Sequence, residues 1–378
     1  MNPMMNTVAR RRIALALGVS LCAASPDLGA QERRTSGSAS DLITREVRQS
    51  VDRGLAYLAE TQDPNGYWRQ DVGFKLNSSY SVTNENSPHI GVTALCLIAF
   101  LAGGHVPGRG QYGEVIENGL DYVLSQVKPD GQILDAGSRM YSHAFATLFL
   151  SEVYGMTQRE DVRRALQSAV NIIVSSQNRE GGWRYKPFAR ESDMSITVCQ
   201  VLALRSARNV GIAVPAETVV DAERYVRRSA VSRGDMDTFG HFGQFDQGGA
   251  FRYQLREHSR ATFPLTAAGV TTLHAAGIYE DPVIDEAFDY LDGALNRFNR
   301  QNFGHYFFYY GHYYAVQAYY TSGSRFRGYY VDIRDLLIRE QRPDGSWPCR
   351  VGPGHAFATA VSSLILQIPY QYLPIFQR

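Results

Sequence analysis

The sequence has 378 residues, 44% of them hydrophobic and 20% charged, so it can bury a large core and is too apolar for a disordered chain. The formal net charge is +1, and no basic stripe follows the first residues. This excludes the electrostatic signature of a nucleic-acid-binding protein, and we expect no nucleic-acid partner. The four cysteines lie far apart and none forms a CxxC pair, so we expect no disulfide framework.

The N-terminal segment has the pattern of a signal peptide. Arg10, Arg11 and Arg12 precede an apolar run from Ile13 to Ala24 that is too short to span a bilayer. We predict a signal peptide at residues 1–30, a linker at 31–41 and export to the periplasm or the outside of the cell. The arginines match a twin-arginine signal weakly. A buried N-terminal helix is the alternative. No later apolar stretch reaches the roughly 18 residues of a membrane span, so we expect no transmembrane anchor.

Three segments share one spacing of Gln, Gly and Trp, in which Gly follows Gln by four residues and Trp by six. They contain all three tryptophans: Gln62-Asp-Pro-Asn-Gly66-Tyr-Trp68, Gln177-Asn-Arg-Glu-Gly181-Gly-Trp183 and Gln341-Arg-Pro-Asp-Gly345-Ser-Trp347. Degenerate copies are Val127-Lys-Pro-Asp-Gly131-Gln-Ile133 and Gln247-Gly-Gly-Ala-Phe251-Arg-Tyr253, the second of which resembles Trp183-Arg184-Tyr185. We predict that the glycine takes the left-handed backbone that ends a helix, that the Trp packs between neighbouring units and that the Gln bonds adjacent backbone.

Each of these turns follows an amphipathic helix and precedes an apolar one. The amphipathic helices end near residues 61, 126, 176, 229 and 340, and a sixth, at 289–294, lacks the Gln/Trp turn. The apolar helices are expected at 89–102, 141–154, 195–207, 265–276, 306–320 and 355–368. A helix without a polar face is buried on all sides, and a period of about fifty residues with two helices indicates an array of helical hairpins.

Such an array forms either an open solenoid or a closed double ring. Apolar inner helices at both ends of the chain favour closure, because an open array needs polar caps. We therefore predict an all-α fold: a single α/α toroid over residues 42–378, with about six hairpins in an outer and an inner layer.

At these residues the sequence resembles the prenyltransferase and squalene-oxidase repeat superfamily, which includes triterpene cyclases and the β subunits of protein prenyltransferases. The Gln-x3-Gly-x-Trp segments are similar to the QW motifs of that group. The tail from Pro348 to Arg378 resembles that of small exported, planctomycete-type repeat proteins. The resemblance covers about residues 42–378 and implies a toroid with a central ligand cavity, ringed by the N-termini of the inner helices.

Residues that begin the inner helices would meet at one mouth of such a cavity. They are His89, His143, Asp193, His312 and His355, with Tyr141 and Tyr309 close by. Imidazoles and a carboxylate beside an apolar cavity suit acid–base chemistry, so we predict catalytic roles for Asp193, His143, His312 and His355. The alternative is that Asp193 only caps a helix and that the histidines bond locally.

The run Tyr306-Phe-Phe-Tyr-Tyr310-Gly-His-Tyr-Tyr314 is the densest aromatic cluster in the sequence. Aromatic rings around a cavity stabilise carbocations or stack on sugars, and they also fill cores. We predict ligand contacts for His89, Tyr141, Tyr309, Tyr310 and Tyr313.

The resemblance also implies where family members carry their chemistry. Triterpene cyclases hold their acid in a D-x-D-D-T segment, and the nearest match here is Asp193-Met-Ser-Ile-Thr197, with Ser195 in the protonating position. A hydroxyl cannot protonate an alkene, so squalene-type cyclisation is not expected. Protein prenyltransferases bind zinc where Tyr310, His312 and His355 fall in this sequence. Two histidines without a clear third ligand make a weak site, so we predict no metal and no cofactor.

Two functional hypotheses follow from the sequence. The first is an exported, cyclase- or prenyltransferase-like protein that binds an apolar, isoprenoid-type ligand in a central cavity, with catalysis left open. The second is a non-catalytic envelope scaffold or interaction protein that retains the toroid. A polysaccharide-active toroid would need several carboxylates along a groove, whereas Asp193 stands alone at the inner rim. The sequence identifies no protein partner.

Overall fold

The computed structural model describes residues 39–76, 79–231, 248–256 and 259–376. These residues form twelve α-helices, one two-stranded sheet and short 3-10 helices. The predicted signal peptide at 1–30 and the linker as far as residue 38 lie outside the described residues. None of the described helices is both long enough and apolar enough to cross a membrane.

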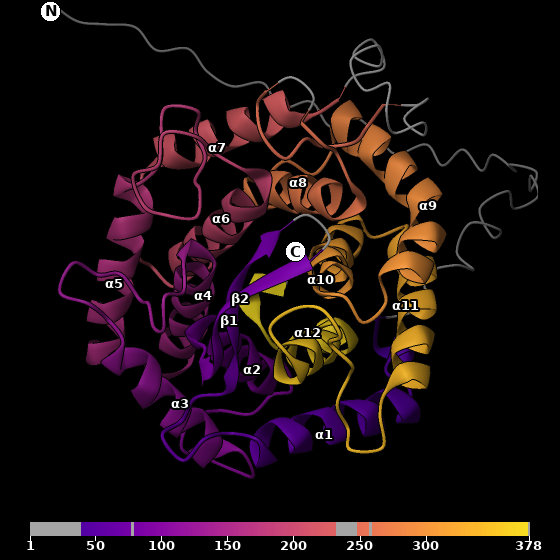
Figure 1. Cartoon of the computed structure of the whole chain (residues 1–378). Helices are drawn as coiled ribbons and strands as arrows, with labels where there is room; N and C mark the ends of the chain where they lie inside the picture. Colours follow the sequence, from indigo (N-terminus) through magenta and orange to yellow (C-terminus); the bar gives the residue numbers. More distant parts are fainter. Residues whose placement is uncertain (1–38, 77–78, 232–247, 257–258, 377–378) are drawn as a thin grey trace, which may run out of the picture. The chain divides into compact units, whose positions relative to one another are not determined.

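The helices of residues 39–376 alternate between two concentric layers (Figure 1). The outer layer contains α1 (Arg45–Glu60), α3 (Gly113–Ser125), α5 (Glu160–Ser175), α7 (Ala216–Ser229), α9 (Pro282–Asn302) and α11 (Phe326–Glu340). The inner layer contains α2 (Ile90–Ala102), α4 (Met140–Thr157), α6 (Met194–Asn209), α8 (Phe263–Ala275), α10 (Tyr306–Ser322) and α12 (His355–Gln367). The predicted all-α toroid is confirmed.

Burial follows the hydrophobic pattern of each layer. All 13 residues of α2 are buried, as expected for a helix without a polar face. The outer helix α5 buries one stripe, which includes Val162, Leu166 and Ile173, and exposes Arg164. Apolar residues at this spacing cover one side of a helix. Each outer helix therefore packs its apolar side against the inner layer and exposes its polar side to water.

The inner helices form a closed ring. Each packs against the next in the order α2, α4, α6, α8, α10 and α12, and α12 packs against α2. In the outer layer α1 contacts both α11 and α12, so the first helix also meets the last hairpin.

Each of the three Gln–Gly–Trp turns joins its own unit to the following one through the same hydrogen bonds. The Gln side-chain amide donates to the carbonyl of its own Gly and to a carbonyl near the start of the next outer helix. The partners are Gly66 and Val115 for Gln62, Gly181 and Thr218 for Gln177, and Gly345 and Ser50 for Gln341, at 2.8–3.0 Å. Because Ser50 belongs to α1, the ring closes through the contact that joins the earlier units.

The glycine and tryptophan of each turn are both needed for this packing. Gly66 has φ +90°, and a Cβ on it would lie 2.1 Å from the carbonyl oxygen of Asn118 in the next outer helix. The three indole N–H groups donate to carbonyls of the preceding outer helix at 2.7–2.8 Å: Trp68 to Leu58, Trp183 to Ile173 and Trp347 to Leu337. The predicted role of the motif is therefore structural.

One degenerate turn has a different register from the one expected. Gly249, with φ +81°, takes the glycine position, and Phe251 takes the Trp position, since its N–H donates to Thr266 Oγ1 at 3.1 Å as the Trp N–H groups donate to threonines. The Gln position of this register, residue 245, and the expected Gln247 both lie outside the described residues.

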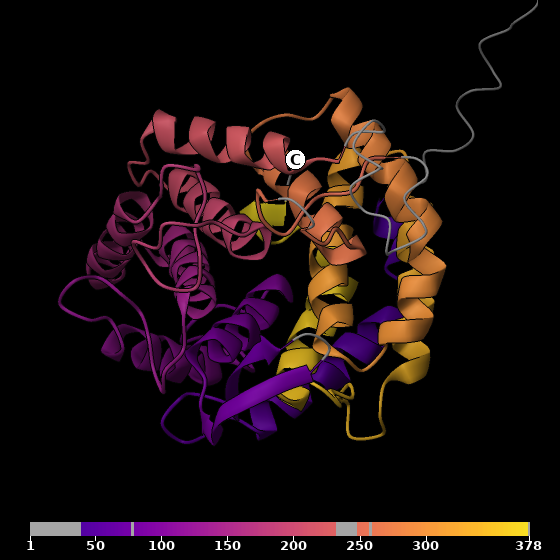
Figure 2. The same cartoon turned by 45° about the horizontal axis from the view of Figure 1, so that its top comes forward.

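A β-hairpin that the sequence analysis did not predict lies across one end of the ring (Figures 1 and 2). Strands β1 (Arg69–Leu76) and β2 (Ser79–Pro88) pair antiparallel. The Asp71 N–H donates to the Pro353 carbonyl at 2.9 Å, before α12, and the Asn84 side chain donates to the Ala136 carbonyl at 2.6 Å, before α4. The hairpin is thus tied to the rim at two separate places.

The C-terminal segment fills the opposite end. It contains the short helices η3 (Ile368–Tyr370) and η4 (Pro374–Phe376), and η4 packs on α6. Leu373, Ile375 and Phe376 are buried there, beside Leu202 and Tyr320 near the C-terminal ends of inner helices. One end of the ring therefore carries a roof, and the other is packed with side chains.

Candidate functional site

A cavity of about 380 Å³ lies under the hairpin, at the N-terminal ends of the inner helices. Its volume falls in the range of roughly 300–1,000 Å³ that is usual for small-molecule sites. Val72, Phe74 and Tyr80 of the hairpin contribute to its lining. Below it the ring is packed, since Cys199 Sγ and the Tyr314 hydroxyl lie 2.9 Å apart and both residues are buried.

Apolar side chains make most of the cavity wall. Aliphatic and aromatic residues line it from five of the inner helices: Val92 and Leu95, Phe145, Leu265, Phe307, and Phe357 and Val361. Among the described residues the lining contains no Asp, Glu or Lys; its ionisable basic groups are His89, Arg139 and Arg260. The wall is therefore suited to an apolar molecule.

Four of the nine predicted site residues line this cavity: His89, Tyr141, Tyr310 and Tyr313. His89 caps α2, where its Nδ1 accepts from the Val92 N–H at 3.4 Å. Burial lowers the pKa of His89 to about 4, so its imidazole is neutral near pH 7. An uncharged ring agrees with the apolar character of the wall.

Asp193 lies behind the wall and reaches the cavity through hydroxyl groups. It caps α6, where Oδ1 accepts from the Ile196 N–H at 2.9 Å. The Ser195 hydroxyl donates to the same oxygen at 2.6 Å, and the Tyr141 hydroxyl donates to Ser195 Oγ at 2.6 Å. Ser195 and Tyr141 both line the cavity. A chain of two hydroxyls therefore connects a fully buried carboxyl with the ligand space.

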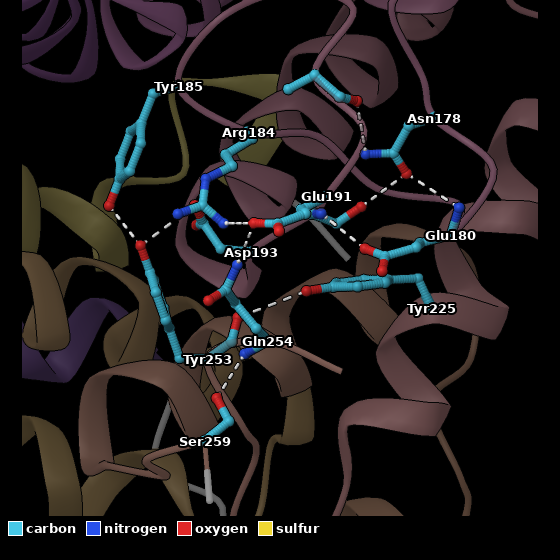
Figure 3. Close-up of polar contacts among 12 residues, drawn as sticks. Asn178, Glu180, Arg184, Tyr185, Glu191, Asp193, Tyr225, Tyr253, Gln254 and Ser259 are labelled. Carbon is cyan, nitrogen blue, oxygen red and sulfur yellow. Dashed lines mark hydrogen bonds and ion pairs between the residues drawn. The ribbon is translucent and has the colours of Figure 1, made fainter. Parts of the chain in front are cut away.

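A second set of hydrogen bonds links Asp193 to the cavity through two tyrosines (Figure 3). The Tyr253 hydroxyl donates to Asp193 Oδ2 at 3.3 Å and lies 2.5 Å from the Tyr185 hydroxyl. Both tyrosines line the cavity. Their backbones hold the rim together, since the Tyr185 carbonyl accepts from the Met140 N–H of α4 and the Tyr253 carbonyl from the Met194 N–H of α6.

The environment of Asp193 moves its pKa towards neutral pH. Burial is the largest influence and raises the pKa of Asp193 to about 6, while the Ser195 hydroxyl and the Ile196 N–H oppose the rise. The carboxyl therefore changes its protonation state near neutral pH, and it accepts hydrogen bonds from the hydroxyls of Ser195 and Tyr253. The expected helix-capping role and a connection to the cavity are both present at this residue.

His143 has a structural environment away from the cavity. It is fully buried; Nδ1 accepts from the Ile133 N–H at 3.1 Å, and Nε2 lies 3.1 Å from the Ala169 carbonyl. Ile133 is the Trp-equivalent of its turn, and in other turns a threonine hydroxyl accepts this N–H. The expectation that His143 lies at the cavity rim is thus corrected: it replaces a threonine of the repeat and is absent from the lining.

His312 points away from the cavity. Its Nδ1 lies 2.7 Å from the Tyr329 hydroxyl of α11 and its Nε2 lies 2.7 Å from Asn299 Oδ1 of α9. Burial lowers the pKa of His312 to about 3, which keeps it neutral. The residue lies in the second turn of α10, where its side chain faces the outer layer, so its expected place at the rim is also corrected.

Two further predicted residues also lie outside the cavity lining. His355 Nδ1 is 3.1 Å from Arg342 Nη1 in the last Gln–Gly–Trp turn. Tyr309 is fully buried and its hydroxyl donates to the Pro348 carbonyl. The inner helices rotate successive residues by about 100°, so adjacent positions at a helix start face different neighbours.

The polar lining residues that sequence reasoning missed include Arg139, Tyr185, Tyr253 and Arg260. One available signal was the likeness of Phe251-Arg-Tyr253 to Trp183-Arg-Tyr185, because equivalent positions of adjacent repeats bring both tyrosines to the same rim. Within the described residues no group of three or more His, Cys, Asp or Glu side chains could hold a metal ion.

No protein-family model matches this sequence, and no curated protein shows significant similarity to it. Solved structures do resemble the fold. The GH76 mannosidase Bt3792 of Bacteroides thetaiotaomicron VPI-5482 is 10% identical with a TM-score of 0.59, over 86% of this chain and 98% of that one. The GH76A α-1,6-mannanase of Salegentibacter sp. HEL1_6 is 9% identical with a TM-score of 0.60, over 86% and 99%.

A second kind of enzyme has a similar structure. The type II terpene cyclase MstE of Scytonema is 14% identical with a TM-score of 0.53, over 87% of this chain and 100% of that one. At these identities the likeness establishes architecture and leaves activity open. The chain therefore has the α/α toroid fold that type II terpene cyclases and GH76 enzymes also adopt.

Proposed function

We propose that this chain binds an apolar, isoprenoid-type ligand in its central cavity. The observation that carries the proposal is the wall itself: aliphatic and aromatic side chains under an aromatic roof, with no carboxylate among the described lining residues. The similar cyclase MstE has been captured with geranylgeranyl dihydroxybenzoate as substrate, which supports an isoprenoid as the class of ligand.

The cavity is less suited to the sugar chemistry of the other structural relatives. The mannanase of Salegentibacter is described as inactive when two neighbouring aspartates of that enzyme are replaced by asparagine, and this variant binds α-1,6-mannotriose. Glycoside hydrolysis normally uses a pair of carboxylates that flank the scissile bond. Here Asp193 is a single carboxyl that lies behind the wall.

The proposal concerns binding and does not assign a reaction. Ser195 stands at the position that the cyclase resemblance gives to the protonating acid, and a hydroxyl is far too weak an acid to protonate an alkene. Asp193 and its hydroxyl partners are instead suited to orient a polar group of the ligand. We also propose that residues 1–30 direct export, so that binding takes place in the periplasm or outside the cell.

Native mass spectrometry of residues 31–378 with geranylgeraniol tests the proposal. Val361 lines the cavity and Val220 is exposed on the outer helix α7. We expect one bound geranylgeraniol per chain, a loss of affinity of about tenfold or more in Val361→Trp, and no change in Val220→Trp. Circular dichroism would confirm that both variants fold.

Equal binding by the two folded variants would contradict the proposal. Binding of α-1,6-mannotriose in place of geranylgeraniol would favour a sugar ligand. Binding of neither would favour the envelope scaffold, the alternative that no specific observation of the structure supports.

A further inference from the structure

We propose that the ligand of this cavity is an amphiphile with an anionic head, a carboxylate or a phosphate, which Arg139 and Arg260 bind at the rim while the apolar tail points inward. This inference rests on the proposed function and deepens it. It follows from the position of the two guanidinium groups, their surroundings and the change of polarity along the cavity.

Arg139 is fixed at the rim by aromatic rings. It is the last residue before α4, half-buried, and lines the cavity. Its Cζ lies 4.9 Å from the ring centroid of Phe74 in the hairpin and 5.6 Å from that of Tyr185. A guanidinium that stacks on aromatic faces keeps its N–H donors available at the edges, which is how arginine binds carboxylate and phosphate.

Arg260 occupies a corresponding position beside α8. It is half-buried, lines the cavity, and its Cζ lies 4.5 Å from the ring centroid of Tyr253. Its carbonyl accepts from the Tyr253 N–H at 2.9 Å, so the backbone fixes the two residues together.

The two arginines flank one pair of tyrosines. Arg139 stacks on the ring of Tyr185, and Arg260 stacks on the ring of Tyr253. The hydroxyls of the two tyrosines lie 2.5 Å apart. Figure 3 shows these tyrosines converging on Asp193 from neighbouring turns. Both cations therefore stack on the two tyrosines whose hydroxyls meet at this part of the rim.

No carboxylate among the described residues forms an ion pair with Arg139 or Arg260. The nearby Glu191 is paired with Arg184 at 2.8 Å. Half-buried cations in an apolar wall favour a counter-anion, because burial strengthens their attraction for it.

The opposite part of the cavity is mostly apolar, although Tyr313, whose ring packs against Phe145, brings one hydroxyl there. Leu95, Phe145 and Val361 lie one to two turns further along their helices than the rim residues and carry no polar group. A ligand that satisfies both parts has one charged end and a hydrocarbon body. A neutral isoprenoid would leave the two guanidinium groups without a partner.

Three ligands with the same chain and different heads test this inference: geranylgeraniol, geranylgeranoic acid and geranylgeranyl phosphate. Isothermal titration of residues 31–378 should give affinities for the anionic ligands at least about tenfold higher than for the alcohol. Arg139→Met and Arg260→Met should each lower the affinity for the anions by about tenfold and leave that for the alcohol unchanged. The preferred anion identifies the head as carboxylate or phosphate.

Arg208→Met is the matched control, because Arg208 is exposed at the end of α6 away from the cavity. Arg139→Lys, which keeps the charge, should retain part of the preference. Equal affinities for alcohol and acids, or equal losses for alcohol and acids in the two variants, would overturn the head-group assignment and leave the apolar site intact. Failure of all three ligands to bind would overturn the proposed function as well.

Discussion

Each end of the ring contains a fully buried carboxyl on an inner helix, and the two differ in their access to the cavity. Asp193, at the hairpin end, is linked to the ligand space through Ser195 and the tyrosines. Glu152 of α4, at the other end, accepts from the Ser206 hydroxyl at 2.6 Å and lies near the backbone of Ile375. Burial raises the pKa of both, to about 6 and about 7. Both carboxyls therefore share a raised pKa, and what distinguishes Asp193 is its connection to the cavity.

The largest expected effect on stability comes from a substitution at the packed end of the ring, compared with one in the hairpin at the roofed end. Leu373 is fully buried in the C-terminal segment, so Leu373→Ala should lower the free energy of unfolding by about 2–5 kcal/mol and leave ligand affinity unchanged. Phe74 is half-buried in the hairpin, so Phe74→Ala should cost about 1 kcal/mol or less and weaken binding. Urea denaturation measures the free energy of unfolding of each variant, and titration with geranylgeraniol measures its ligand affinity. A similar loss of binding in the two variants would remove the distinction between the ends.

A pH-dependent effect should follow from Glu152. Its pKa is raised from the ordinary 4.5 to about 7, so folding favours the protonated form. The protonated side chain therefore makes its full contribution to the free energy of unfolding below about pH 4. This contribution is lost as the pH rises through about 7 and the carboxyl ionises. Glu152→Gln should therefore raise the free energy of unfolding at pH 8 by on the order of 1–3 kcal/mol and have little effect at pH 4.

Glu114→Gln, on an exposed position in the first turn of α3, is the control for that comparison and should give no gain at either pH, only a loss of up to about 1 kcal/mol at pH 8 from the helix dipole. A gain from Glu152→Gln that is equal at pH 4 and pH 8 would show that ionisation of this carboxyl is not its cause.

The smallest expected effect comes from two tyrosines for which the sequence analysis predicted the same role, ligand contact. Tyr141 donates its hydroxyl to Ser195 at the cavity, and Tyr309 donates to the Pro348 carbonyl outside it. Tyr141→Phe and Tyr309→Phe should each cost about 0.5–1.5 kcal/mol of stability. Ligand affinity should fall in the first variant alone; an equal decrease in both would mean that the lining is not as described.

Most of the fold could be predicted from the sequence because its signals are repeated. The Gln–Gly–Trp turns mark the helix ends, and the six apolar helices were located to within about three residues. The hairpin gave no such signal: β2 reads Ser79-Tyr-Ser-Val-Thr-Asn-Glu-Asn-Ser-Pro88, mostly polar and exposed, without the alternation that marks a strand.

The site was harder to predict because equivalent helix positions can face different ways. His143 and Thr93 hold the same place in the repeat and accept the same kind of backbone N–H, yet in the sequence one suggests catalysis and the other does not. Arg139 and Arg260 gave no pattern at all, since their positions depend on stacking against the tyrosines of two adjacent turns. Helix periodicity indicates which residues are buried, and it does not indicate which of them meet at the centre.

The hydrogen bonds between Gln341 and Ser50 have a consequence for how the protein unfolds. In an open solenoid the terminal repeats have one neighbour and can fray first. Here the first and last units are neighbours, so each hairpin of the described ring packs against two other hairpins. The described ring therefore has no terminal repeat at which unfolding can begin more easily than elsewhere. Loss of any one hairpin breaks two interfaces at once, which makes unfolding of the ring a concerted event.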